Sequence, residues 1–196
     1  MIPLETQGTY HIYNRANGNE KIFSNRGNYD FFLSRYVDHI HPIAETFCYC
    51  LMPNHFHFLL RIRKEEEIQE NLKETFSKLK FNKKPEIEKI MSKRFSNFFS
   101  SYTQAFNKQQ SRMGSLFMKN FKRKRVTEQK YLLNLVHYIH SNPVEAGIVA
   151  KPEIWKYSSY KILIDENAKS FLNREEVIDW FGDKENFIQY DSNSLK

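Results

Sequence analysis

The sequence predicts an α+β domain with an antiparallel sheet of the split βαβ, or ferredoxin-like, kind and with helices on one face of that sheet. Strand-like segments and helical segments alternate along the chain, with extra helices in the middle and at the C-terminus. The 196 residues are 40% hydrophobic and include 17 Phe and 11 Tyr, which is enough apolar surface for a substantial core.

The β-rich segments have distinct patterns. Residues 8–16 alternate in polarity and are rich in Tyr and Ile, which predicts a strand. Residues 45–52 and 55–62 are two further β-rich runs separated by Pro53 and Asn54, as in consecutive antiparallel strands. A short β-like run at 115–118 follows Gly114 and leads into a basic stretch.

Helical spacing of apolar residues predicts helices at 28–41, 65–82 and 86–111. A further helix is expected from about Thr127 to Ser141, with its apolar residues on one face: Leu132, Leu135, Val136 and Ile139. Asn142-Pro143 should end this helix, because a residue before proline is disfavoured in the α region. The remaining residues, with Trp155, Tyr157, Tyr160 and then 177–181, are expected to form a small C-terminal appendage.

Charge divides the chain into two parts. The whole chain has a net charge of +7, but its last 32 residues hold eight acidic and four basic residues. We therefore expect one domain over residues 1–164, in which 68–99 forms a helical elaboration, and an acidic appendage over 165–196. Residues 119–125 place five cations in seven positions, and residues 73–94 hold eight cations and three glutamates. Either run alone is best explained as a solvated face, but the two runs beside an acidic tail favour a nucleic-acid surface.

Composition also excludes several classes of protein. The sequence has no apolar run of about 18 residues and no secretory signal pattern at its start. Its two cysteines, Cys48 and Cys50, cannot form a disulfide framework or a four-thiolate zinc site. The expected location is the cytoplasm.

The segment around His55 and His57 contains the clearest chemical signal. In a strand these two side chains share one face about 7 Å apart, while Phe56 and Phe58 point to the opposite, core face. Two imidazoles at this spacing can converge on one metal ion, although most His-x-His pairs do not. A third ligand must therefore come from another element.

The helix at 127–141 offers Tyr138 and Asn142, which are four residues apart and therefore on one helical face. That face is distinct from the apolar stripe. Taken alone, Tyr138 is better explained as a residue at the edge of the core, and Asn142 as a helix-end residue.

Several segments resemble the small single-strand DNA transposases that use one catalytic tyrosine. These segments are 10–15 (YHIYNR), 50–57 (CLMPNHFH), 114–122 (GSLFMKNFK) and 137–149 (HYIHSNPVEAGIV). The branch that the sequence resembles most is the REP-associated tyrosine transposases, bacterial proteins linked to repeated palindromic elements. The likeness runs in order from about Thr9 to Tyr160, and residues 68–99 carry no matching motif.

This resemblance implies a tyrosine nucleophile at Tyr138 and a divalent metal, Mg²⁺ or Mn²⁺, held by His55, His57 and Asn142. Some relatives use Gln instead of Asn at the last position. Nitrogen ligands by themselves favour Mn²⁺ or Zn²⁺ over Mg²⁺. The implied partner is single-stranded or hairpin DNA, and both a monomer and a homodimer remain open. The expected DNA-binding residues are Arg15, Lys119, Lys122, Arg123, Lys124 and Arg125.

Two other functions remain open from the sequence alone. A domesticated relative could bind hairpin or single-stranded nucleic acid without cutting it, and such a binder would tolerate Tyr138→Phe. An unrelated metallohydrolase would use a metal-activated water and form no covalent adduct. The absence of a motif such as His-Glu-x-x-His disfavours the hydrolase.

Overall fold

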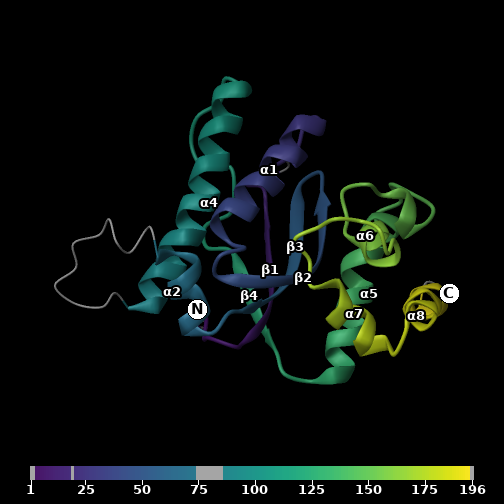
Figure 1. Cartoon of the computed structure of the whole chain (residues 1–196). Helices are drawn as coiled ribbons and strands as arrows, with labels where there is room; N and C mark the ends of the chain where they lie inside the picture. Colours follow the sequence, from purple (N-terminus) through teal and green to yellow (C-terminus); the bar gives the residue numbers. More distant parts are fainter. Residues whose placement is uncertain (1–2, 19, 74–85, 195–196) are drawn as a thin grey trace.

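A computed structural model describes residues 3–18, 20–73 and 86–194 of the chain (Figure 1). The strands are β1 (Thr9–Arg15), β2 (Ala44–Met52), β3 (His55–Ile62) and β4 (Lys122–Val126). The helices are α1 (Arg26–His39), α2 (Glu65–Asn71), α4 (Ile87–Gln109), α5 (Gln129–Glu145), the 3₁₀ turn η1 (Pro152–Ile154), α6 (Tyr160–Ile164), α7 (Arg174–Phe181) and α8 (Lys184–Ser194). None of the helices within the described ranges is long and apolar enough to cross a membrane.

The four strands form one antiparallel sheet in the order β2-β3-β1-β4. β1 lies between β3 and β4, and the β2–β3 hairpin turns at Pro53 and Asn54 as expected. This strand order and the helix between β1 and β2 are those of the split βαβ arrangement, so the predicted α+β fold is confirmed.

Helices α1 and α4 cover one face of the sheet, on the left of Figure 1. Their aromatic side chains pack on the apolar face of β3. For example, the Tyr36 ring lies parallel to that of Phe58 at 4.0 Å, and Phe32 packs against Phe98 at 4.8 Å. Burial of these large rings makes this layer the main source of hydrophobic stabilisation.

The prediction of helices on one face only requires a correction. α5 packs on the opposite face against β2 and β3, and α6, α7 and α8 lie on the same side of the molecule (Figure 1). A second core cluster there joins Cys48 and Cys50 of β2 to Val136 and Ile139 of α5. The sequence signal for this layer is the nearly unbroken apolar run of β2, which is typical of a strand buried on both faces.

Two element boundaries also differ from the predictions. The run at 115–118 contributes only a single bridge, between Ala16 and Phe117, whereas the basic stretch itself forms β4. The backbone turns at Asn120, which has a φ of 63°, before it returns alongside β1. Helix α2 ends at Asn71, and part of the helix predicted at 65–82 lies outside the described residues.

Helix α5 does not end at Asn142-Pro143 as predicted, but continues to Glu145 with Pro143 inside its last turn. Gly147, with a φ of 67°, terminates it instead. The Ile148 N–H donates to the Pro143 carbonyl and the Gly147 N–H donates to the Val144 carbonyl, both at 2.9 Å. These bonds satisfy carbonyls of the final turn and end the helix there.

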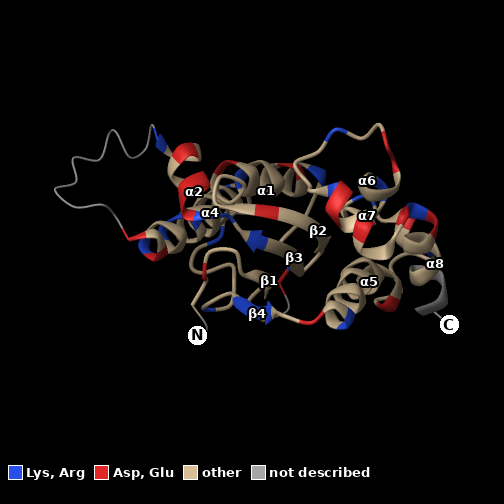
Figure 2. Ribbon diagram, turned by 60° about the horizontal axis from the view of Figure 1, so that its bottom comes forward, with Lys and Arg blue, Asp and Glu red and all other residues tan. Residues whose placement is uncertain are grey.

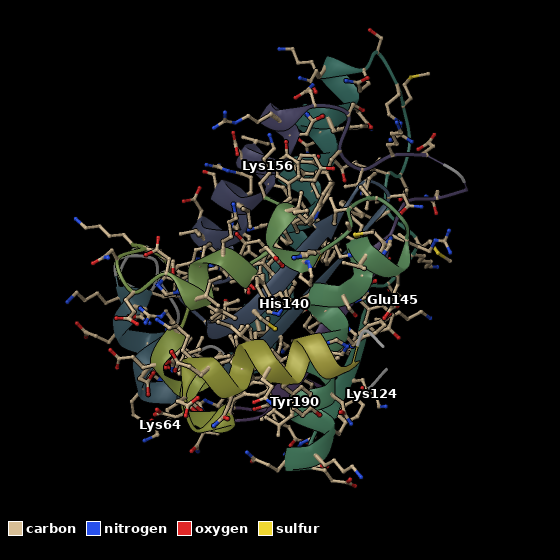
Figure 3. The ribbon with its side chains drawn as sticks, turned by 90° about the vertical axis from the view of Figure 1, so that its right-hand side faces the viewer. Lys64, Lys124, His140, Glu145, Lys156 and Tyr190 are labelled. Carbon is tan, nitrogen blue, oxygen red and sulfur yellow. The ribbon has the colours of Figure 1, made fainter. Side chains whose placement is uncertain are left out.

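The C-terminal residues cover the outer edge of β2. The Tyr49 N–H donates to Ser159 Oγ at 2.8 Å, and the Trp155 Nε1–H donates to the Leu51 carbonyl at 3.0 Å. Phe187 of α8 is fully buried against the α5 layer; in Figure 3, α8 lies in front of His140. Residues on both sides of position 164 therefore share one core, while the domain division predicted there stays a prediction.

Phe187 and Ile188 are adjacent in α8, but only Phe187 is fully buried in this shared core, so the two residues should contribute differently to stability. Phe187→Ala should lower the free energy of unfolding by roughly 3 to 5 kcal/mol, because it leaves a cavity beside α5. Ile188→Ala, at a position that is 36% exposed, is the matched control and should cost much less. Urea unfolding followed by circular dichroism measures both. Equal, small effects would show that residues 165–196 are an appendage that adds little to the stability of the sheet.

A second prediction concerns acid stability. His140 is fully buried, its Nε2 lies 2.7 Å from Ser159 Oγ, and burial, with a smaller contribution from His137, lowers its pKa to about 3. Between pH 6.5 and 3 the unfolded chain therefore binds a proton at this residue that the folded chain does not. The free energy of unfolding should fall as the pH is lowered through this window, by at most about 1.4 kcal/mol per pH unit from this group.

Replacing His140 with Gln removes the titrating group and keeps a polar side chain near Ser159. The variant should show a shallower loss of stability than the wild type in urea unfolding at pH 7, 6, 5 and 4. A slope identical to that of the wild type would contradict the assignment of this acid sensitivity to His140.

Candidate active site

One face of the central strands carries polar and ionisable side chains in two adjacent rows across the sheet. In the first row Tyr13 of β1 lies between His57 of β3 and Lys122 of β4. In the second row His11 lies between Leu59 and Lys124. Residues paired directly across antiparallel strands point to the same face. The register therefore gathers two histidines, a tyrosine and two lysines on the face that α5 partly covers.

His57 is held by a neighbouring histidine. Its Nδ1 lies 2.8 Å from Nε2 of His11, and the two rings stack with centroids 5.1 Å apart. Burial lowers the pKa of His57 to about 2, and the charges of His11 and His55 act in the same direction. Burial and then the charge of Lys124 lower the pKa of His11 to about 4. Both imidazoles are therefore neutral at physiological pH.

His55 is oriented by the residue before it. Its Nδ1 lies 2.7 Å from Asn54 Oδ1, and its Nε2 lies 3.5 Å from Asn142 Oδ1. Burial lowers the pKa of His55 despite the opposing effect of the Asn142 contact. Because an amide oxygen only accepts, His55 donates through Nδ1 and presents the Nε2 lone pair to Asn142. Two acceptor atoms thus face each other across 3.5 Å, an arrangement that a cation between them would satisfy.

Helix α5 brings Tyr138 and Asn142 to this face. Asn142 Nδ2 donates to the Tyr138 carbonyl at 2.5 Å, which fixes the amide so that its oxygen points toward His55. The Tyr138 ring meets the His57 ring edge-on at 5.5 Å between centroids, yet the residue remains 41% exposed. Burial of its remaining surface raises the pKa of Tyr138, while Asn142 acts in the opposite direction. Tyr138 is therefore protonated at neutral pH and open to an incoming ligand.

The structure thus brings together the four residues that the sequence analysis singled out as a site: His55, His57, Tyr138 and Asn142. Within the described residues, no group of three His, Cys, Asp or Glu could hold a metal ion. The third ligand would instead be the Asn142 amide oxygen, beside two neutral imidazoles. This donor set fits a divalent cation of the Mn²⁺ or Zn²⁺ type, and a ligand role for these residues stays a prediction.

The predicted DNA-binding residues divide between the two faces of the sheet. Lys122 and Lys124 lie on the site face, and Lys124 Nζ lies 4.2 Å from the centre of the Tyr131 ring on α5. Arg123 and Arg125 point to the other face, where Arg123 covers the Phe121 ring and Arg125 pairs with Glu5 at 2.5 Å. Figure 2 shows β4 almost wholly in the colour of Lys and Arg.

Two further cations were predicted to contact DNA. Arg15 is exposed at the end of β1, directly across from His55, and Lys119 is exposed in the loop that precedes β4. Arg61 shares the face of the histidines but binds Glu45 and Glu176, with its Nη1 donating to Glu176 at 2.7 Å. Arg61 therefore ties α7 to the sheet, away from the Tyr138 site.

The sequence analysis missed three residues that contact the site: His11, Tyr13 and Asn54. The signal for the first two was present, because His11, Tyr13 and Arg15 alternate along β1 on the face opposite the buried Tyr10 and Ile12. Only the register between β1 and β3 shows that this face meets His57.

Comparison with known proteins supports the resemblance noted in the motifs. No protein-family model matches the chain. A Haemophilus influenzae protein named "Putative REP-associated tyrosine transposase" is 25% identical over 120 residues, which is 61% of this chain and 61% of that relative's length. A solved structure described as the REP-associated tyrosine transposase bound to a REP hairpin matches with a TM-score of 0.60. That match covers 87% of each chain at 14% identity, so it shows a shared fold. The resemblance of this chain to REP-associated tyrosine transposases is therefore confirmed.

Proposed function

We propose that this protein is a metal-dependent enzyme that cuts and rejoins single-stranded DNA at palindromic hairpins, through a 5′-phosphotyrosine intermediate on Tyr138. The observation that carries the proposal is a partly exposed tyrosine beside two buried, neutral imidazoles and an inward-facing amide oxygen. The similarity to a solved transposase that binds a REP hairpin supports DNA of this kind as the substrate.

The reaction exchanges one phosphate ester for another. Tyr138 Oη attacks the scissile phosphorus, the bond from phosphorus to the 3′ oxygen breaks, and the phenolic proton is lost as the departing 3′ oxygen gains one. The 5′ phosphate of the downstream fragment is then linked to Tyr138, and the upstream fragment ends in a free 3′ hydroxyl. Attack by a 3′ hydroxyl on the phosphotyrosine reverses these steps, so rejoining needs no external energy source.

His55, His57 and Asn142 would hold Mg²⁺ or Mn²⁺ in this proposal. Such an ion, when bound, stabilises negative charge on the phosphoryl oxygens. The raised pKa of Tyr138 means that the chain alone forms little phenolate at neutral pH, so a nearby positive charge is needed for the attack. The neutral state of His55 and His57 keeps their lone pairs available as ligands.

The chain also offers cations for the DNA backbone. Lys122 and Lys124 line the same face as the histidines and continue it toward the free edge of the sheet. Contacts from lysines to phosphates position a strand without reading its sequence. In this proposal the two lysines hold the strand on the side of Tyr138.

The nucleophile is tested by mixing the protein with labelled DNA hairpins that carry single-stranded flanks, in Mn²⁺ or Mg²⁺. Wild type should give a DNA–protein adduct on a denaturing gel, and Tyr138→Phe should give none while it retains hairpin binding. Tyr13→Phe and Tyr131→Phe are matched controls from the same face and should keep the adduct. Binding without an adduct in wild type, over a broad panel of hairpins, would instead support a non-catalytic hairpin binder.

The two faces of β4 give a second test. The double variant Lys122→Ala/Lys124→Ala should weaken hairpin binding and reduce the slope of log affinity against log salt concentration by about 1.4, since each single-strand phosphate contact contributes about 0.7. Arg123→Ala/Arg125→Ala removes the same charge from the opposite face and should change the slope less. Fluorescence anisotropy at 50 to 300 mM salt measures both. Equal slopes in the two variants would argue against DNA binding along the site face.

A further inference from the structure

His11 is a buried ionisable group next to the described site that the proposed reaction does not use. It lies on β1 and is only 6% exposed. Its ring stacks on those of Tyr13 and His57 with centroid distances of 4.6 and 5.1 Å, and Tyr13 and His57 also stack on each other at 5.7 Å. In the sheet register it pairs with Leu59, and its ring reaches diagonally to His57. Packing alone does not call for an imidazole here, because an aromatic hydrocarbon ring would also stack on these neighbours.

We propose that His11 is a positioning residue that fixes the ring orientation and the tautomer of His57. This inference rests on the proposed function, in which His57 supplies a metal ligand. His11 Nε2 lies 2.8 Å from His57 Nδ1. In the proposed arrangement His11 Nε2 accepts the Nδ1–H of His57, which leaves the lone pair of His57 on Nε2. His11 in turn carries its own proton on Nδ1.

The 2.8 Å contact between the two ring nitrogens holds a single proton, because a hydrogen bond there needs one N–H and one lone pair. If the shared proton belonged to His11 Nε2, His57 Nδ1 would be the acceptor and the proton of His57 would lie on its own Nε2. The Nε2 of His57 could then not bind a cation. The position of one proton between His11 and His57 therefore decides whether His57 can act as a ligand.

His55 has the same arrangement, but its acceptor is the amide oxygen of Asn54 instead of a second imidazole. Asn54 Oδ1 accepts from Nδ1 of His55 at 2.7 Å and leaves the Nε2 lone pair directed at Asn142. Each of the two histidines thus has an acceptor at Nδ1, and in each case this leaves Nε2 free. Such outer contacts set the tautomer of a ligating histidine, and their loss commonly weakens metal binding by 10- to 100-fold.

The tautomer is read directly in metal-free protein by long-range ¹⁵N–¹H correlation spectra of the histidine rings. Wild type should show the proton of His57 on Nδ1 and an unprotonated Nε2. His11→Phe keeps a stacking ring but removes the acceptor, and its His57 should populate both tautomers. His11→Gln offers an amide oxygen as acceptor and should restore the Nδ1–H form. Tyr13→Phe is the matched control, because it keeps a ring stacked on both histidines, and it should leave the spectrum as in wild type.

The second readout is Mn²⁺ affinity measured by isothermal titration calorimetry. His11→Phe should bind Mn²⁺ 10- to 100-fold more weakly than wild type, His11→Gln should recover most of the loss, and Tyr13→Phe should match wild type. Thermal unfolding followed by circular dichroism checks that all variants are folded. Equal Mn²⁺ affinity in wild type and His11→Phe, or a wild-type His57 protonated on Nε2, would overturn the role of His11.

Failure of the proposed function gives a different result. If wild type binds no Mn²⁺ and forms no DNA adduct, metal-dependent cleavage is wrong, and the tautomer spectra of the metal-free variants then decide alone whether His11 sets the state of His57.

Discussion

The register in which β1 pairs with β3 decides which side chains meet on each face of the sheet. With Tyr13 opposite His57, the imidazoles of His11 and His57 come within 2.8 Å on one face, and Ile12 and Phe58 enter the core on the other. A slip by one residue would bury the histidines among aromatic rings and expose the phenylalanines. The large apolar layer under α1 and α4 therefore holds the site in place, because it penalises a slip by one residue.

Helix α5 depends on this sheet and completes the site. Its apolar stripe packs on β2 and β3, which directs Tyr138 and Asn142 to the edge of the histidine cluster. Continuation through Pro143 matters here, because Asn142 then stays one turn after Tyr138 and donates to its carbonyl. The residues after α5 cover the outer edge of β2, where Trp155 and Ser159 hydrogen-bond to the backbone of that strand. Ser159 also contacts His140 of α5 and so holds the helix against the sheet.

The cations of β4 lie on both faces of the sheet, because side chains alternate between the faces along a strand. The same alternation places the core on one face and the site on the other. Lys122 and Lys124 continue the rows that begin at His57 and Leu59, whereas Arg123 and Arg125 lie over Phe121 and beside Glu5. The basic run of β4 thus contributes cations to both faces of the sheet.

The sequence by itself determined the strands at residues 9–15, 44–52 and 55–62, the helix between the first two, the shared face of His55 and His57, and the spacing of Tyr138 and Asn142. Each of these follows from a local period of two or 3.6 residues. The motifs added the resemblance to REP-associated tyrosine transposases. Only the tertiary structure decided that α5 lies on the histidine face, that the basic run is a strand with two faces, and that His11 and Asn54 orient the histidines. These features depend on pairings between residues up to about a hundred positions apart, and no local pattern encodes a register or a choice of sheet face.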